Sequence, residues 1–166
     1  MLVVALVAFR LDYCNSLLNG LSQTQMLRLQ RVQNTAARLI CRIKKFEHIS
    51  TSLQSAYWLP VVLRPRFKLL FIVFRVLRGV DPLYLQELIC PYRPTRSLRS
   101  ESIDLYVPAC RTATYGNRLF TVETAILWND LLQEVRDAEN ISSFKRLLKT
   151  HFFNSAFPQH CRSVCS

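Results

Sequence analysis

The apolar positions of this chain recur at helical spacing over most of its length. Between residues 22 and 45 they fall on one face of a helix of about 3.6 residues per turn, at Leu29, Val32, Ala36, Leu39, Ile40 and Ile43. Ser22 and Gln25 form a capping box that starts this helix, and no Pro or Gly interrupts it before about Lys45. The same spacing predicts further helices at 1–18, 49–58, 65–79, 82–89, 119–132 and from Asn140 or Ser142 onward.

The segments between the helices have a different character. Residues 90–104 are rich in Pro, Arg and Ser and indicate a basic linker or extended arm, and residues 105–108 alternate weakly, as in a short strand. The predicted fold is mostly α: an irregular helical bundle with a basic linker and a smaller C-terminal helical pair. The expected parts are a bundle at 1–90, a linker at 91–118, C-terminal helices at 119–153 and a loose tail at 154–166.

Composition agrees with helices and adds a strong charge. Only 3 of the 166 residues are Gly, although 50% are hydrophobic, which favours a helical core over a turn-rich β fold. The 22 Lys and Arg residues exceed the 11 acidic residues, and a net charge of +11 predicts attraction to a polyanion. The hydrophobic stretch 61–80 contains five cations, too many for a lipid-facing span. A membrane partner is not expected, and a membrane-associated protein that uses residues 1–9 and the basic helices is a third alternative.

Three groups of cations are candidates for phosphate contact. The first is on the helix face opposite the apolar one, where no acidic residue follows at the third or fourth position: Arg31, Arg38, Arg42 and Lys45. The second is a stripe of Lys68, Arg75 and Arg78 beside Phe71, which fits a phosphate backbone and a stacked base but equally the one solvated side of a buried helix. The third is Arg93, Arg96 and Arg99, which fits either an RNA-binding arm or a solvated linker.

The residue pattern predicts no catalysis, cofactor or metal. No two Asp residues are adjacent, no Gly-rich phosphate loop is present, and nothing places a nucleophile beside a base. His160, Cys161 and Cys165, with His151, lack the paired spacing of a structural zinc site. Trp58 and Trp128 are expected to be core anchors at helix ends.

Several segments, in order, resemble the C-terminal part of reverse transcriptases from LINE-type (non-LTR, jockey-like) retrotransposons. They span residues 10 to 153 and read RLDYCNSLL, LQRVQNTAARLI, WLPV, RGVDPLYL, RSLRS, YGNRLF, LWNDL and FKRLLKTHFF. The chain departs from the family at Tyr57, where its members usually have His, and at Pro65, where they usually have another residue. The family's Asp-Asp polymerase motif and its endonuclease region are absent from this sequence, so no catalytic residue carries over.

The resemblance implies a thumb and C-terminal extension that hold template RNA, primer or target DNA. We therefore expect a non-catalytic nucleic-acid-binding remnant of such an enzyme, found in the nucleus or cytoplasm, with RNA or DNA and a polymerase core as partners. The alternative is a structural or interaction fragment of a decayed element, whose helices expose apolar surface that once packed on a missing core.

Overall fold

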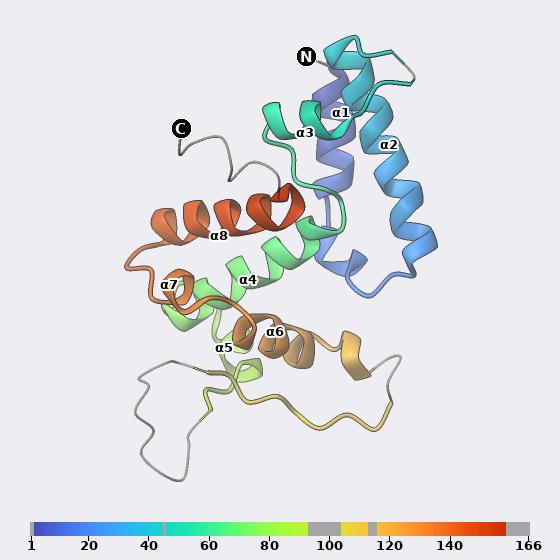
Figure 1. Ribbon diagram of the computed structural model, residues 1–166. Helices are drawn as coiled ribbons and strands as arrows, with labels where there is room; N and C mark the ends of the chain where they lie inside the picture. Colours follow the sequence, from blue (N-terminus) through green and yellow to red (C-terminus); the bar gives the residue numbers. More distant parts are fainter. Residues whose placement is uncertain (1, 45, 93–103, 113–115, 159–166) are drawn as a thin grey trace. The chain divides into compact units, whose positions relative to one another are not determined.

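The computed structural model describes residues 2–44, 46–92, 104–112 and 116–158, and these form an all-helical structure (Figure 1). The predicted all-α class is therefore confirmed for the described part of the chain. Its elements are α1 (Leu2–Asp12), η1 (Asn15–Leu18), α2 (Gln23–Cys41), α3 (Ser50–Ser55), α4 (Leu63–Leu77), α5 (Leu83–Leu88), η2 (Gly116–Arg118), α6 (Phe120–Asn129), α7 (Gln133–Arg136) and α8 (Ile141–Ala156).

Contacts divide the chain into two compact units. Unit 1 comprises residues 1–67 and 149–166, and unit 2 comprises residues 68–148. The boundaries fall inside α4 and α8, so each of these helices contributes residues to both units. This division follows contacts and differs from the expected parts, which followed changes in composition along the sequence.

Unit 1 is built around an antiparallel hairpin of α1 and α2 (Figure 1). The turn between them uses Gly20 at a φ of +76°, as the Asn19-Gly20 pair predicts. Leu11, Met26 and Val61 are buried together, and partly buried aliphatic side chains from both helices pack around them. The hairpin therefore packs against the segment 58–61, which has the sequence WLPV.

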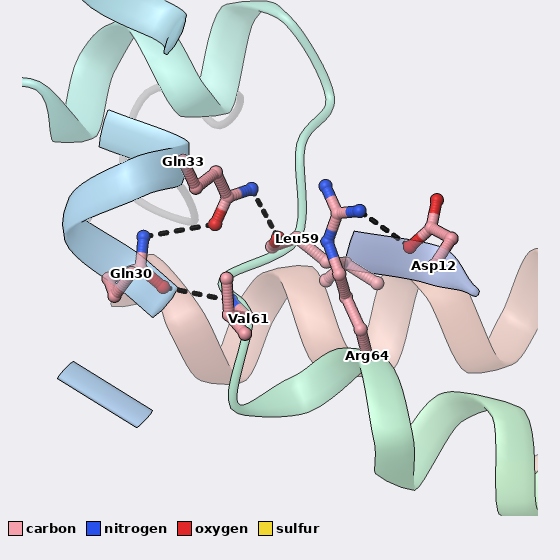
Figure 2. A network of polar contacts seen from close by, with 6 residues as sticks. All are labelled: Asp12, Gln30, Gln33, Leu59, Val61 and Arg64. Atoms are coloured by element: carbon pink, nitrogen blue, oxygen red, sulfur yellow. Dashed lines mark hydrogen bonds and ion pairs between the residues drawn. The ribbon is translucent and has the colours of Figure 1, made fainter. Parts of the chain in front are cut away.

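A polar network joins α2 to this segment (Figure 2). The Gln33 amide donates to the Leu59 carbonyl at 2.9 Å, and the Val61 N–H donates to the Gln30 side chain at 2.8 Å. Gln30 also donates to the Gln33 oxygen at 3.0 Å. Arg64, at the start of α4, donates to the same Leu59 carbonyl and pairs with Asp12 of α1 at 2.6 Å. Two of the segments that carry the family resemblance thus bind each other directly.

Unit 2 has an aromatic core. Phe74 of α4 stacks on Phe144 of α8, with ring centroids 4.0 Å apart, and Trp128 of α6 also stacks on Phe144, with ring centroids 6.1 Å apart. All three rings are buried. Leu148, one turn further along α8, is also buried, so α8 contributes an apolar face to this core.

The segment expected to be a strand forms a single isolated bridge, between Pro91 and Leu105. The Asn129 side chain, from the LWNDL sequence, completes the pairing by donating to the Leu105 carbonyl at 2.9 Å and accepting from its N–H at 2.8 Å. The Asn129 side chain thus makes with Leu105 the two hydrogen bonds that the backbone of a neighbouring β-strand would make. Arg136 holds the same segment through a 2.6 Å ion pair with Asp104.

Several expected helix boundaries were wrong. α2 ends at Cys41 instead of continuing to Lys45, because Arg42 adopts the left-handed conformation at a φ of 52° without being Gly. The helix expected at 82–89 is α5, Leu83–Leu88, with Pro82 at the cap position, and the preceding Asp81 pairs through its carboxylate with Arg75 at 2.7 Å. The helix expected at 119–132 ends at Asn129, and the separate short helix α7 follows it.

The helix starts that rest on side-chain caps were predicted better. The Ser22 hydroxyl accepts the Gln25 N–H at 3.4 Å, as a capping box requires. Asn140 accepts the Ser143 N–H at 2.8 Å and so is the cap of α8, which settles the choice between Asn140 and Ser142. Such caps are local, and their geometry depends on only a few neighbouring residues.

Candidate nucleic-acid interface

The candidate interface is built on α2, which is 19 residues long and contains no acidic residue. Arg28, Arg31 and Arg38 lie on this helix, and Arg42 follows as its C-terminal cap residue. The macrodipole favours cations near a helix C-terminus, and Arg38 lies in the last turn of α2. The helix therefore holds a run of positive charge with no carboxylate of its own to neutralise it.

The four predicted residues of this face do not share one environment. Arg31 and Arg42 are exposed, and neither makes an ion pair or side-chain hydrogen bond within the described part of the chain. Arg38 is half-buried and donates to two backbone carbonyls, Lys44 at 2.6 Å and Glu47 at 3.0 Å. Lys45 lies outside the described residues. The Arg38 side chain is thus bound to the loop after α2. The side chains of Arg31 and Arg42 are exposed and have no such partner within the described residues.

The buried face of α2 differs from the predicted one. Val32 and Leu39 were expected in the core, but they are 50% and 63% exposed. The residues that are buried are Met26, Gln33, Ala36 and Ala37. The physical reason is that Gln33, which periodicity treats as polar, is satisfied by the Leu59 carbonyl and can be completely buried. The helix is therefore rotated about its axis relative to the expectation.

This rotation brings apolar side chains and cations to one open groove, here called the α1–α2 groove. Its volume is about 780 Å³, and it is lined by Val7, Arg31, Val32, Thr35, Ala36, Arg38, Leu39, Arg42 and Ile43. The sequence placed the cations and the aliphatic residues on opposite faces, whereas the structure places both kinds at the same groove. None of these described lining residues is acidic.

The positive charge of the chain is concentrated in unit 1. This unit holds 11 of the 22 Lys and Arg residues but only two of the 11 acidic residues, Asp12 and Glu47, for a formal net charge of +9. Unit 2 holds the other 11 cations and nine acidic residues, for a net charge of +2. Moreover, Asp12 is already paired with Arg64. A polyanion would therefore be attracted mainly to unit 1.

The second predicted stripe, in unit 2, is largely used within the protein. Arg75 pairs with Asp81 and lies 5.9 Å from the Phe71 ring centroid, and Arg78 donates to the Ala138 carbonyl and lies over Phe74 at 5.2 Å. Lys145 also lies over Phe71, at 6.0 Å. Lys68 is exposed and makes none of these contacts. Of these three cations, Lys68 alone is exposed without a partner among the described residues, as phosphate contact requires.

The third group, Arg93, Arg96 and Arg99, lies outside the described residues. The residues on either side of that segment are described, and they meet: the Tyr92 N–H donates to the Asp104 carbonyl at 2.8 Å, and the Tyr106 N–H donates to the Cys90 carbonyl at 2.8 Å. The two ends of the arginine-rich segment are thus held together by backbone hydrogen bonds.

Other cations of unit 1 were not predicted as site residues. Arg28, Lys44 and Arg66 are exposed and add to its charge. Arg28 was recognisable, because it lies on the same acid-free helix as Arg31. Lys149 was not, because its position above the rings of Tyr57, at 5.5 Å, and Phe153, at 5.8 Å, depends on tertiary contacts.

Comparisons with known proteins place no constraint on this site. No family model, curated protein or solved structure matches the chain. Within the described ranges, no group of three or more His, Cys, Asp or Glu side chains is arranged to hold a metal ion, and His160, Cys161 and Cys165 lie outside them. None of the helices described is both long and apolar enough to cross a lipid bilayer.

Proposed function

We propose that the chain binds single-stranded RNA or DNA through its phosphates, as a non-catalytic remnant of a LINE-type reverse transcriptase. Two observations carry this proposal together: the charge of unit 1, +9, and the acid-free helix α2 in that unit, which has exposed arginines. Phosphate contacts supply most non-specific affinity for nucleic acids, and they need cations that no internal partner neutralises. Arg28, Arg31 and Arg42 meet that condition.

The sequence resemblance supports the same function from a different direction. The segments that resemble the thumb and C-terminal extension of these enzymes include residues 29–40 of α2. In such enzymes this region holds nucleic acid while a separate polymerase core performs catalysis. A remnant with this region alone would retain binding without polymerisation.

A salt titration of binding tests the proposal. Fluorescence anisotropy of a labelled single-stranded RNA of mixed sequence is measured with the purified chain at increasing KCl, with the same DNA sequence in parallel. Three phosphate contacts predict a slope of about −2 in log K against log salt, since each contact on a single strand contributes about 0.7. Affinity that stays constant as salt rises would refute phosphate binding.

A second candidate is a structural fragment whose helices pack on a polymerase core, and it rests on the apolar surface of α1. Leu6, Phe9 and Tyr13 recur at helical spacing and are 63%, 76% and 79% exposed, and Leu17 beyond them is 78% exposed. A continuous apolar face of this kind typically marks a protein contact. Under this candidate the chain would bind nucleic acid no more tightly than a control protein of equal charge, and its solubility would depend on these side chains.

A further inference from the structure

Phosphate binding does not explain why the α1–α2 groove is lined mainly by aliphatic side chains. Its aliphatic lining comes from Val7, Val32, Ala36, Leu39 and Ile43, and none of the lining residues within the described ranges is aromatic. Phosphates need no aliphatic surface, and bases are held by stacking on aromatic side chains or on arginine. The lining instead suits an aliphatic side chain flanked by carboxylates, because Arg31 and Arg42 lie along the same groove.

The chain itself presents a surface of that complementary kind, in unit 2. The segment 130–139, here called the acidic turn, contains α7 and carries four exposed carboxylates, on Asp130, Glu134, Asp137 and Glu139. Its exposed large hydrophobic residue is Leu132, at 56% exposure. None of these four carboxylates makes an ion pair within the described ranges of the chain. The nine acidic residues of unit 2 thus include a cluster with free charge around one exposed leucine.

We propose that the acidic turn of one copy of this chain docks on the α1–α2 groove of a second copy. Leu132 enters between Val32 and Leu39, and the carboxylates of Glu134 and Asp137 face Arg31 and Arg42. Opposite potentials steer such surfaces together, and the desolvated leucine contributes apolar burial. Because the groove and the turn are different surfaces, the contact is heterologous, and association grows with protein concentration.

This self-association goes beyond the proposed binding of nucleic acid, but the two share Arg31 and Arg42. RNA and the acidic turn therefore compete for the groove, and added RNA is expected to dissociate the assembled copies. The competition makes the free charge of α2 available either to another copy or to a phosphate backbone, but not to both.

A charge swap tests the proposal on the full chain. Sedimentation velocity is measured over a range of concentrations at low salt, after nuclease treatment, for the native protein and two double variants. One variant carries Arg31→Glu and Arg42→Glu, and the other carries Glu134→Arg and Asp137→Arg. For each variant alone, the dissociation constant for self-association is expected to rise at least about tenfold, because its groove and turn then have the same sign of charge. An equimolar mixture of the two is expected to associate again, since each groove then meets a turn of opposite charge.

Matched controls separate this contact from general charge effects. Arg28→Glu, on α2 but outside the groove, and Glu87→Lys, on α5 but outside the turn, are expected to leave association unchanged. Leu132→Ser is expected to weaken association without altering charge and not to weaken RNA binding, which distinguishes failure here from failure of nucleic-acid binding. Circular dichroism checks the helicity of every variant, and Arg31→Gln with Arg42→Gln replaces a charge reversal that does not fold.

Three results would overturn the proposal. The first is a native protein that stays monomeric at every concentration. The second is association that does not change in the swapped variants or that is lost equally in the Arg28 and Glu87 controls. The third is a mixture of the two swapped variants that fails to associate, which would show that the groove and the turn do not meet.

Discussion

At the scale of single residues, Gln33 joins two of the segments that resemble the LINE-type enzymes, LQRVQNTAARLI and WLPV. It is fully buried, and its amide donates to the Leu59 carbonyl while its oxygen accepts from Gln30. A buried amide is stable only when its polar atoms are hydrogen-bonded, so the burial of Gln33 on α2 depends on the position of the WLPV segment. This interdependence gives a structural role to residues that the sequence alone would assign to solvent.

We expect Gln33→Leu to lower the free energy of unfolding by about 1–3 kcal/mol, because it leaves buried polar partners in Gln30 and the Leu59 carbonyl with fewer hydrogen bonds. Urea denaturation of both proteins measures the change. The matched control is Gln23→Leu, an exposed position on the same helix, for which the change should stay within about 0.5 kcal/mol. Equal midpoints for the native and Gln33 variant proteins would contradict the role of the network.

The two tryptophans, both expected to be core anchors, differ in burial. Trp128 is 2% exposed and lies in the aromatic core of unit 2, whereas Trp58 is half-buried. We expect Trp128→Ala to cost about 3–5 kcal/mol, because it removes a whole ring from a close-packed core, and Trp58→Ala to cost less. Denaturant midpoints of the two variants provide the comparison. A larger loss for Trp58→Ala would show that unit 1 depends on its tryptophan more than its burial indicates.

At the scale of elements, the end of α2 shows how a helix can stop without Gly or Pro. Arg42 adopts the left-handed conformation, the Ile43 N–H donates to the Arg38 carbonyl at 3.1 Å, and the Arg38 side chain holds the loop that follows. A helix end of this kind depends on contacts of the following loop, which are absent from any local pattern. The expected end at Lys45 failed for that reason.

This geometry predicts opposite effects for two neighbouring arginines. Arg42→Gly should keep or raise stability, by up to about 1 kcal/mol, because Gly adopts a positive φ without strain. Arg38→Ala should lower stability by about 1 kcal/mol, because the carbonyls of Lys44 and Glu47 lose their donor. Thermal unfolding followed by circular dichroism measures both. A destabilised Arg42→Gly protein would mean that the Arg42 side chain itself holds the helix end.

At the scale of the whole molecule, the available charge is divided unevenly between the units. Unit 1 carries nearly all of the excess positive charge, whereas the arginines of the unit 2 stripe are bound to carboxylate, carbonyl or ring partners. Two groups that look alike in sequence therefore have different surroundings: Arg31 and Arg42 of unit 1 are exposed, and the arginines of the unit 2 stripe make contacts within unit 2.

A pair of double variants tests this division. Replacing Arg31 and Arg42 by Gln should reduce the salt slope of RNA binding by about 1.4, for two lost phosphate contacts, and leave stability nearly unchanged. Replacing Arg75 and Arg78 by Gln should leave the slope nearly unchanged and lower the free energy of unfolding. Anisotropy titrations and urea denaturation are measured on both. If the unit 2 variant lost the greater part of the slope, the phosphate contacts would lie on α4 instead.

The sequence by itself determined the helical class, the capped starts of α2 and α8, and the total charge, because these depend on local spacing and on composition. The tertiary structure alone decided which face of α2 is buried and which arginines are free. Periodicity assigns each residue a side from its own polarity, but Gln33 is buried by a carbonyl 26 positions away and Arg78 is held by one 60 positions away. Whether a polar group is exposed or buried depends on its partner, and only the folded chain brings such partners together.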